Sequence, residues 1–329
     1  CANIFPYSGS HGSLDVDATF RQDYTSNFES LQKADVCLLI GVNPRKEATM
    51  LNVRLRRRVL SGDLLVASLG VSENLSYPCS YLGGTISVLL QILEGRHPFC
   101  KVLGKAKNPV ILLAAEWGTK QIISAVQQRF AQQVQLLHGT ANGVGALDLG
   151  LSGSPLGQRY KVVYILGGLV SANRSLCNVL QHAEFVIYHG SHGQNIANLA
   201  MVIPASVSAL EKDGFFINTE GRVQETKVAL SSAVQEYKVL RALSGQSSFT
   251  LQQIRARLIT QVAPHLAHVH SRATVSFSRY VRFNKKLCNA SLAPAVVNFY
   301  LTDCVSFYSK VMADCTQMLR DTSHNYSKL

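Results

Sequence analysis

The stretch Ala34-Asp-Val-Cys-Leu-Leu-Ile-Gly41-Val-Asn-Pro44 decides the fold of this chain. A short apolar run that ends at a glycine is typical of a buried strand, and Asn43-Pro44 then indicates a turn. A helical pattern follows over residues 47–60, and the apolar run over residues 63–70 again ends at a glycine. This order of strand, helix and strand predicts a βαβ unit with parallel strands.

The same alternation continues along the chain. Further strands are expected at residues 108–115, 161–168 and 184–190, and a short one at 200–204 that a proline ends. Helices are expected at residues 84–93, 120–137, 234–243, 251–259 and 301–319. We therefore expect an α/β fold with doubly wound, mostly parallel sheets and a C-terminal helical extension.

We expect three parts along the sequence. Residues 1–107 form a first α/β unit, residues 108–262 a second one, and residues 263–329 an extension with a terminal helix. A length of 329 residues is sufficient for about two domains with substantial cores. No apolar run approaches the roughly 18 residues needed to cross a bilayer, so no membrane-spanning segment is expected.

The stretch over residues 211–227 combines turn signals, a short strand and paired charges. Asp213-Gly214 predicts a tight turn, residues 215–217 a buried strand, and Asn218-Thr219-Glu220-Gly221-Arg222 a second turn. Its acidic and basic side chains are placed to bond backbone groups or each other. Because the stretch holds no nucleophile and no metal-ligand cluster, we expect an architectural role.

The chain is basic, with a net charge of +12. Its one arginine cluster is Arg54-Leu-Arg-Arg-Arg58, and Leu51, Leu55 and Val59 form an apolar stripe on the same helix. A solvated or partner-facing helix surface is favoured over a polyanion site, because no nucleic-acid recognition pattern accompanies the cluster. No nucleic-acid partner is therefore expected.

The glycines that follow the strands do not match the nucleotide-binding patterns. Neither Gly41 nor Gly167 begins a G-x-G-x-x-G spacing, Gly143-Val-Gly145 has only its first half, and no P-loop is present. Plain turns between strands and helices are favoured over a vestigial phosphate cradle.

The residues that bear reactive groups form no recognisable catalytic or metal site. His189 and His192 are separated by Gly-Ser, and neither this pair nor the cluster His265, His268 and His270 has a carboxylate or cysteine at ligand spacing. The eight cysteines include no Cys-x-x-Cys pair, which favours free thiols in a reducing compartment. We expect no catalytic, cofactor-binding or metal-binding residue.

Residues 33–48, which include Asn43, Pro44, Arg45 and Glu47, resemble the A-D-x-x-L-L-x-G-x-N-P-R-x-E-A segment of the 75 kDa iron–sulfur subunits of respiratory complex I. The N-T-E-G-R turn also resembles a segment of these subunits. Further matching segments occur in the same order at residues 81–83, 95–99, 105–109, 146–150, 188–193 and 298–303. Residues 264–297 match poorly.

The resemblance implies the fold of the molybdopterin oxidoreductases without a molybdenum cofactor. It also implies a non-catalytic scaffold in the peripheral arm of complex I, on the matrix side of the mitochondrial inner membrane. The family's iron–sulfur clusters belong to an N-terminal region that has no counterpart here, so we expect a C-terminal half, either a fragment or a split gene product. The partners would be other peripheral-arm subunits, including the cluster-bearing half.

Two alternatives stay open. A divergent molybdopterin-type oxidoreductase fragment would use Gly41 and Gly167 to hold a pterin diphosphate. A basic nucleic-acid-binding protein is the weaker alternative. The numbering begins at a cysteine, so either a leader has been removed or the first residues are not included.

Overall fold

The structure is a computed structural model of the chain. It describes Ile4 and residues 28–70, 72–115, 120–130, 133–151, 159–167, 174–193, 196–232, 236–245, 249–267, 292 and 298–326. The chain forms two compact units. Unit 1 comprises Cys1–Gly153, Ile217–Val223 and His270–Val297, and unit 2 comprises Ser154–Phe216, Gln224–Val269 and Asn298–Leu329.

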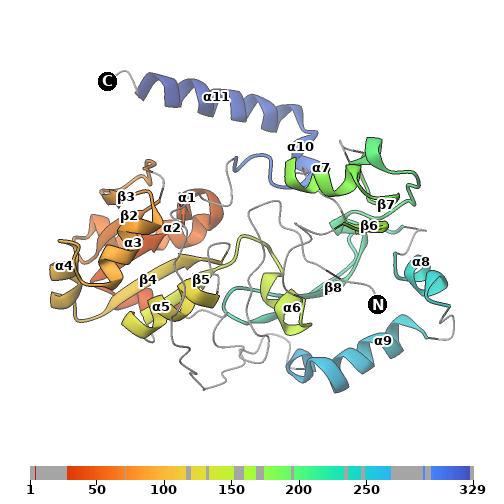
Figure 1. The fold of residues 1–329 in the computed structure, drawn as a ribbon, viewed down its shortest axis with the longest axis horizontal. Helices are drawn as coiled ribbons and strands as arrows, with labels where there is room; N and C mark the ends of the chain where they lie inside the picture. Colours follow the sequence, from red (N-terminus) through yellow and green to blue (C-terminus); the bar gives the residue numbers. More distant parts are fainter. Residues whose placement is uncertain are drawn as a thin grey trace. The chain divides into compact units, whose positions relative to one another are not determined.

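Unit 1 is built on a five-stranded parallel sheet with the strand order β3-β2-β1-β4-β5 (Figure 1). Its strands are β1 (Val36–Ile40), β2 (Leu65–Leu69), β3 (Ser80–Gly83), β4 (Pro109–Ala114) and β5 (Val134–Leu137). This strand order is that of a doubly wound sheet, in which the order reverses beside β1. The expected α/β class is therefore confirmed.

Helices cover both faces of this sheet. On one face, Leu51 and Leu55 of α2 (Thr49–Leu60) pack in one cluster with Cys37 and Leu39 of β1. Buried apolar residues of α3 (Ile86–Leu93) and α5 (Lys120–Phe130) lie outside that cluster. Since every residue of β1 is buried, both faces of the strand are covered, which explains its unbroken apolar run.

The expected helix over residues 120–137 is wrong in its second half. The helix α5 ends at Phe130, and Val134–Leu137 forms strand β5 at the edge of the sheet, paired with β4. A short apolar run suits either state, and pairing with the sheet decides between them. The expected boundary at residues 107/108 also differs from the structure, because β4 is a central strand next to β1.

Unit 2 contains the parallel pair β6 (Val162–Leu166) and β7 (Phe185–His189), joined through α7 (Arg174–Gln181). Residues 200–204, expected as a strand, pair with β7 through one isolated bridge, between Ile187 and Val202, and a second isolated bridge joins Gly190 to Ala205. The remaining helices are α8 (Glu236–Leu243), α9 (Leu251–Arg257), α10 (Cys304–Phe307) and α11 (Lys310–Tyr326). Among the described residues, no helix combines the length and the apolar character needed to cross a bilayer.

The expected helix over residues 301–319 is two helices. Asp303 caps α10 by accepting the N–H groups of Val305 and Ser306, and the break falls at Tyr308 and Ser309. The hydroxyl of Tyr308 donates to the carbonyl of Gly193. This tertiary anchor accounts for a break that the local pattern does not predict.

The stretch over residues 211–227 forms a hairpin of β8 (Gly214–Ile217) and β9 (Val223–Thr226). Gly214 is the first residue of β8, so the tight turn expected at Asp213-Gly214 is wrong. At this open end of the hairpin, Thr226 Oγ1 accepts the N–H of Gly214 at 3.0 Å. The single turn lies between the strands, where Gly221 has a φ of +77°.

Candidate functional site

The predicted residues Asn43, Pro44, Arg45 and Glu47 form one turn, where β1 passes into α1 (Pro44–Glu47). Asn43 Oδ1 accepts the N–H of Arg45 at 3.2 Å, and Glu47 Oε2 accepts the N–H of Asn43 at 3.0 Å. Pro44 is the first helical residue, where its missing N–H costs nothing. The start of α1 is therefore capped by its own side chains.

Glu73, which the sequence did not indicate, joins this turn to the loop after β2. Its carboxylate accepts Asn43 Nδ2 at 2.5 Å and forms an ion pair with Lys46 Nζ at 2.9 Å. Arg45 Nη1 donates to the carbonyl of the adjacent Asn74 at 2.7 Å. The side chain of Asn43 is thus bonded on both of its polar atoms, which fits its burial to 4% exposure.

Leu292 covers the carboxyl ends of neighbouring strands in unit 1. It is fully buried, and its N–H donates to the carbonyl of Gly84 at 2.9 Å. Its carbonyl oxygen lies so near Gly70, which follows β2, that a Cβ on that glycine would come within 3.0 Å. Doubly wound sheets bind ligands beyond the carboxyl ends of their strands, and here the chain itself occupies part of that edge.

The predicted turn Asn218-Thr219-Glu220-Gly221-Arg222 is organised by its first residue. Asn218 Oδ1 accepts the N–H groups of Glu220 at 3.1 Å and of Arg222 at 2.8 Å. The N–H of Asn218 donates to the carbonyl of Arg222 at 3.1 Å, and that of Gly221 to the carbonyl of Asn218 at 2.8 Å. The positive φ of Gly221 is the conformation that glycine adopts without strain.

Two hydrogen bonds join the turn and the strand end before it to the rest of unit 1. Glu220 Oε1 accepts the N–H of Phe28 at 3.3 Å, and Asn142 Oδ1 accepts the N–H of Ile217 at 2.9 Å. The side chain of Arg222 is exposed, and the described residues offer it no ion pair. Of the two arrangements expected for Glu220, a bond to a backbone group or a pair with Arg222, the structure shows the first.

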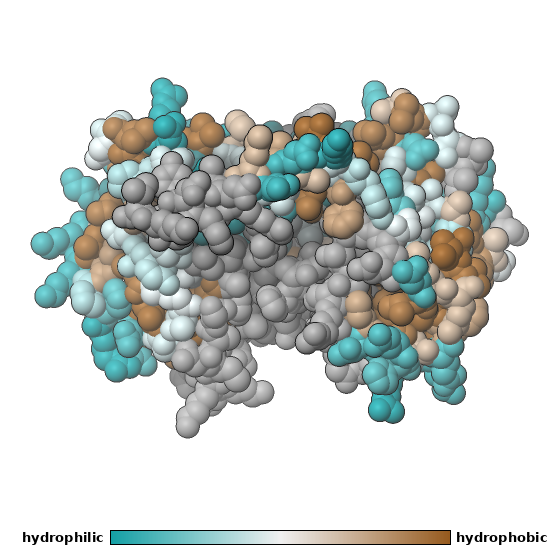
Figure 2. Space-filling view, turned by 90° about the horizontal axis from the view of Figure 1, so that it is seen from above, coloured by the Kyte–Doolittle hydropathy of each residue, from teal (hydrophilic) through white to brown (hydrophobic). Residues whose placement is uncertain are grey.

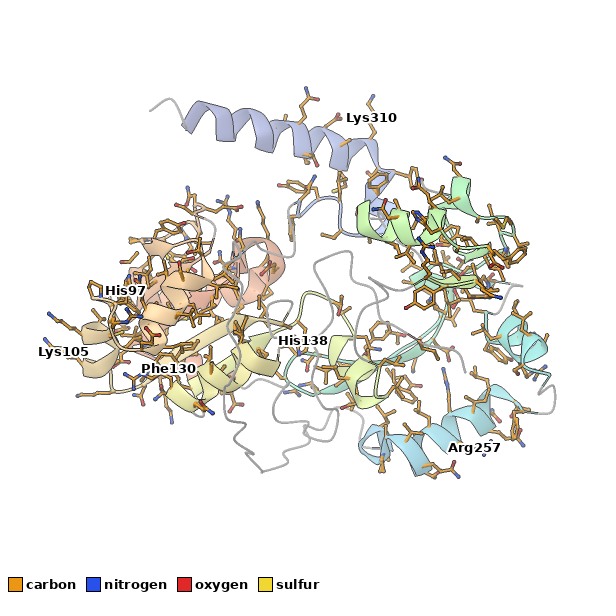
Figure 3. All side chains as sticks on the ribbon, in the orientation of Figure 1. His97, Lys105, Phe130, His138, Arg257 and Lys310 are labelled. Carbon is orange, nitrogen blue, oxygen red and sulfur yellow. The ribbon has the colours of Figure 1, made fainter. Side chains whose placement is uncertain are left out.

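The segment Gly143-Val-Gly145, which has the first half of a G-x-G-x-x-G spacing, leaves room for the Asn142 side chain that bonds Ile217. Asn142 precedes α6 (Gly143–Asp148), and a Cβ on Gly145 would lie only 2.3 Å from Asn142 Oδ1. A Cβ on Gly143 would lie 3.0 Å from Nδ1 of His138, which Figure 3 labels beyond β5. The two glycines therefore leave room for the side chains of Asn142 and His138.

The predicted pair His189 and His192, in unit 2, is engaged in contacts within the protein. His189 is buried, and its Nε2 donates to the carbonyl of Ala205 at 3.0 Å. The other ring nitrogen, Nδ1, therefore accepts a hydrogen bond from the hydroxyl of Tyr164 at 2.7 Å. Burial, and then the charge of Glu236, raises the pKa of Tyr164, which keeps its hydroxyl protonated. His192 stacks on Tyr308 with ring centroids 5.8 Å apart.

No group of three potential ligand side chains that could hold a metal occurs within the described ranges. The side chain of His265 and all of His268 and His270 lie outside these ranges. The five cysteines whose side chains are described are free thiols: Cys37, Cys79, Cys100, Cys177 and Cys315. Burial raises the pKa of Cys79 to about 11, so at neutral pH it is an unreactive thiol.

Comparison with known proteins decides the family. Residues 2–246 match the family model described as molybdopterin oxidoreductase. The chain belongs to the molybdopterin oxidoreductase family. This membership agrees with the parallel sheet of unit 1 and with the fold that the sequence predicts.

The molybdopterin oxidoreductase-like chain is also similar to curated proteins along almost all of its length. It is 35% identical over 92% of its residues to the NADH-ubiquinone oxidoreductase 75 kDa subunit of Reclinomonas americana. It is 34% identical over 97% to the NADH dehydrogenase [ubiquinone] iron-sulfur protein 1, mitochondrial, of Solanum tuberosum. An NADH-quinone oxidoreductase subunit of Rickettsia felis is 30% identical over 94% of the chain.

These similarities confirm the predicted resemblance to the 75 kDa subunits. The chain spans 48%, 46% and 49% of the lengths of these three relatives, about half of each.

The family name implies a molybdopterin cofactor, and the turn at β1 does not fit its anionic diphosphate. Phosphates bind where helix N-termini present free N–H groups. Here Glu47 accepts the N–H of Asn43, Asn43 Oδ1 accepts that of Arg45, and the carbonyl of Asn43 accepts those of Lys46 and Glu47.

Proposed function

We propose that this chain is a non-catalytic scaffold part of the peripheral arm of respiratory complex I, on the matrix side of the mitochondrial inner membrane. The names of its relatives support the assembly. The observation that carries the scaffold role is the burial of Leu292 over the strand ends, next to a β1–α1 turn in which the N–H groups of Asn43, Arg45, Lys46 and Glu47 all have acceptors. Part of the edge of the sheet that binds ligands in this class of fold is therefore occupied by the chain itself.

A close-packed α/β body suits the support of an electron-transfer chain. Protein interiors are packed as densely as organic crystals, so such a body resists deformation. In our proposal the chain holds no iron–sulfur cluster of its own, and the clusters lie in a cluster-bearing N-terminal region or on a separate chain. Its partners are that region and other peripheral-arm subunits, which pass electrons from NADH to ubiquinone.

A native gel of solubilised mitochondrial membranes, probed with an antibody against this chain, tests the proposal. We expect the chain to migrate with the band that has NADH dehydrogenase activity, and its depletion to lower the amount of intact complex I. Migration only as a free chain, with complex I intact in its absence, would overturn the proposal. A second antibody against another peripheral-arm subunit controls for the position of the band.

The family match keeps one other candidate, a divergent molybdopterin-type oxidoreductase fragment. Its diphosphate would have to bind at a turn other than the one after β1. Metal analysis of the purified chain separates the two functions. Molybdenum or tungsten near one equivalent would favour the oxidoreductase, whereas the scaffold requires neither metal.

A further inference from the structure

The arginines of α2 fall into two groups. Arg58 fastens the helix to its own unit, because its Nη1 donates to the carbonyls of Leu31 at 2.8 Å and of Ala34 at 2.6 Å. Arg56 Nε donates to the carbonyl of Ser76 at 3.3 Å. These two side chains are engaged in holding unit 1 together, so they are not the free cations that the sequence pattern had indicated.

Arg54 and Arg57 are different. Both side chains are exposed, and no hydrogen bond or ion pair of either guanidinium occurs within the described ranges. With Met50, Val53 and Leu60 they form what we call the outer α2 face, spaced at i, i+3, i+4, i+7 and i+10. These positions lie opposite Leu51 and Leu55, which are buried against the sheet.

The apolar content of the outer α2 face is unusual for a helix that already buries its inner face. Such a helix ordinarily presents polar side chains outward. Here Met50 is 73% exposed, Val53 58% and Leu60 59%. Elsewhere on the coloured surface apolar and hydrophilic residues are also interspersed (Figure 2), so exposure alone decides nothing. What distinguishes this face is the combination of three apolar side chains with two unpaired arginines on one helix.

We propose that the outer α2 face docks a partner protein whose contact surface combines carboxylates with apolar side chains. Methionine and arginine are enriched in protein interfaces, and arginine is frequent among the residues that dominate binding. Carboxylates would neutralise Arg54 and Arg57 in bidentate pairs. Apolar partner residues would cover Met50, Val53 and Leu60, which a nucleic-acid backbone would leave exposed.

This inference rests on the proposed function only for where the partner is sought, namely among the subunits of the same assembly. A photo-activatable amino acid at position 53 in the full chain tests it directly in a native extract. We expect a cross-link to one protein, at a peptide with at least two carboxylate side chains near the linked residue. Cross-links only within the chain, to lipid, to nucleic acid or to a peptide without carboxylates would overturn the proposal.

Charge reversal gives a second measurement. We expect Arg54→Glu with Arg57→Glu to lower the cross-link yield at least about tenfold, because like charges would then face each other. Reversal of the partner's carboxylates to lysine should restore the yield. The matched control is Lys101→Glu with Lys105→Glu on α4 (Cys100–Lys105), where both lysines are exposed and Lys105 points away from the ribbon (Figure 3). An equal loss of cross-link yield in the arginine and lysine double variants would contradict a specific docking face.

The two proposals fail separately. If the chain does not migrate with complex I but still cross-links from position 53 to a carboxylate-bearing peptide, the proposed docking face is supported and the proposed membership of complex I is refuted. If it migrates with complex I and the reversed variant keeps the full cross-link yield, the assembly stands and the docking face is wrong.

Discussion

Asn142 Oδ1 accepts the backbone N–H of Ile217 at 2.9 Å and so joins the start of α6 to the β8–β9 hairpin. Ile217 is buried at 3% exposure, so water cannot readily replace this bond. Gly145 makes the position of the Asn142 side chain possible, because a Cβ there would overlap its oxygen. The hairpin turn is thereby held in unit 1, while the remainder of the hairpin belongs to unit 2.

We expect Asn142→Ala to lower the free energy of unfolding by about 1–3 kcal/mol, because the N–H of Ile217 loses its acceptor. Gly145→Ala should have a similar effect by displacing the same side chain. Since both changes remove the same bond, the double variant should lose clearly less stability than the sum of the losses in the two single variants. Chemical denaturation of the three variants measures this coupling. Additive effects would show that the two residues act independently.

The Asn43 cap should respond to charge in an unusual way. At an ordinary helix N-terminus aspartate caps as well as asparagine. Here Asn43 Nδ2 donates to Glu73, so Asn43→Asp would set two carboxylates face to face. We expect Asn43→Asp to be at least as destabilising as Asn43→Ala, which should cost about 1–2 kcal/mol.

Glu73→Gln provides the control for this prediction. In that background the carboxylate repulsion is absent, so Asn43→Asp should regain most of its lost stability in thermal unfolding. An Asn43→Asp variant that is as stable as the original protein while Glu73 is intact would show that the bond to Glu73 does not matter.

The local sequence was sufficient for the strands that are buried on both faces. The run Val36–Ile40 is apolar throughout, and with the following glycine and Asn43-Pro44 it indicated both the strand and the turn. It was insufficient for β5, because Val134–Leu137 is strand only through its pairing with β4. The same limit applies to Asn142 and Leu292, whose partners Ile217 and Gly84 are remote in sequence.

Asp35 should give the protein a pH-dependent part of its stability. Burial alone would raise the pKa of this carboxyl, but the N–H groups of Lys107 and Asn108, at 2.5 and 3.0 Å, outweigh it and lower the pKa. Because the folded pKa lies below the unfolded value of about 3.9, this contribution is present above that pH and is lost as the pH falls through the folded pKa.

Asp35→Asn is therefore expected to lower stability at neutral pH and to flatten its decline in acid. The loss should stay below about 1 kcal/mol, because Asp35 is only partly buried and solvent screens its carboxylate. Urea unfolding between neutral pH and about pH 3 measures both effects. If the free energy of unfolding fell with decreasing pH equally in the variant and in the original protein, a lowered pKa at Asp35 would be contradicted.

Leu292 should be a major contributor to the stability of unit 1. We expect Leu292→Ala to cost about 2–5 kcal/mol, because the side chain is fully buried and its removal leaves a cavity. The matched control is Leu243→Ala, at a leucine that is 66% exposed, which should stay within about 0.5 kcal/mol. Equal costs in the two variants would show that Leu292 does not pack as described.

Arg222 separates a role in the fold from a role in assembly. Its backbone closes the hairpin turn, but its side chain is exposed and has no ion pair among the described residues. Arg222→Lys should therefore change the free energy of unfolding by less than about 0.5 kcal/mol. If the guanidinium forms a bidentate pair with a carboxylate of a partner, the same variant should still reduce incorporation into the complex, because lysine cannot form a bidentate pair.

Native gels of Arg222→Lys and Arg222→Ala, with Arg96→Lys as a matched control, measure this incorporation. Arg96 is exposed and bonds Glu94 within its own loop, so its replacement should leave assembly unchanged. Reduced incorporation of both Arg222 variants, with an unchanged free energy of unfolding, would assign the Arg222 side chain to an interface. Full incorporation of Arg222→Lys would restrict the turn to its backbone role, since its remaining bonds are made by Asn218 and by main-chain groups.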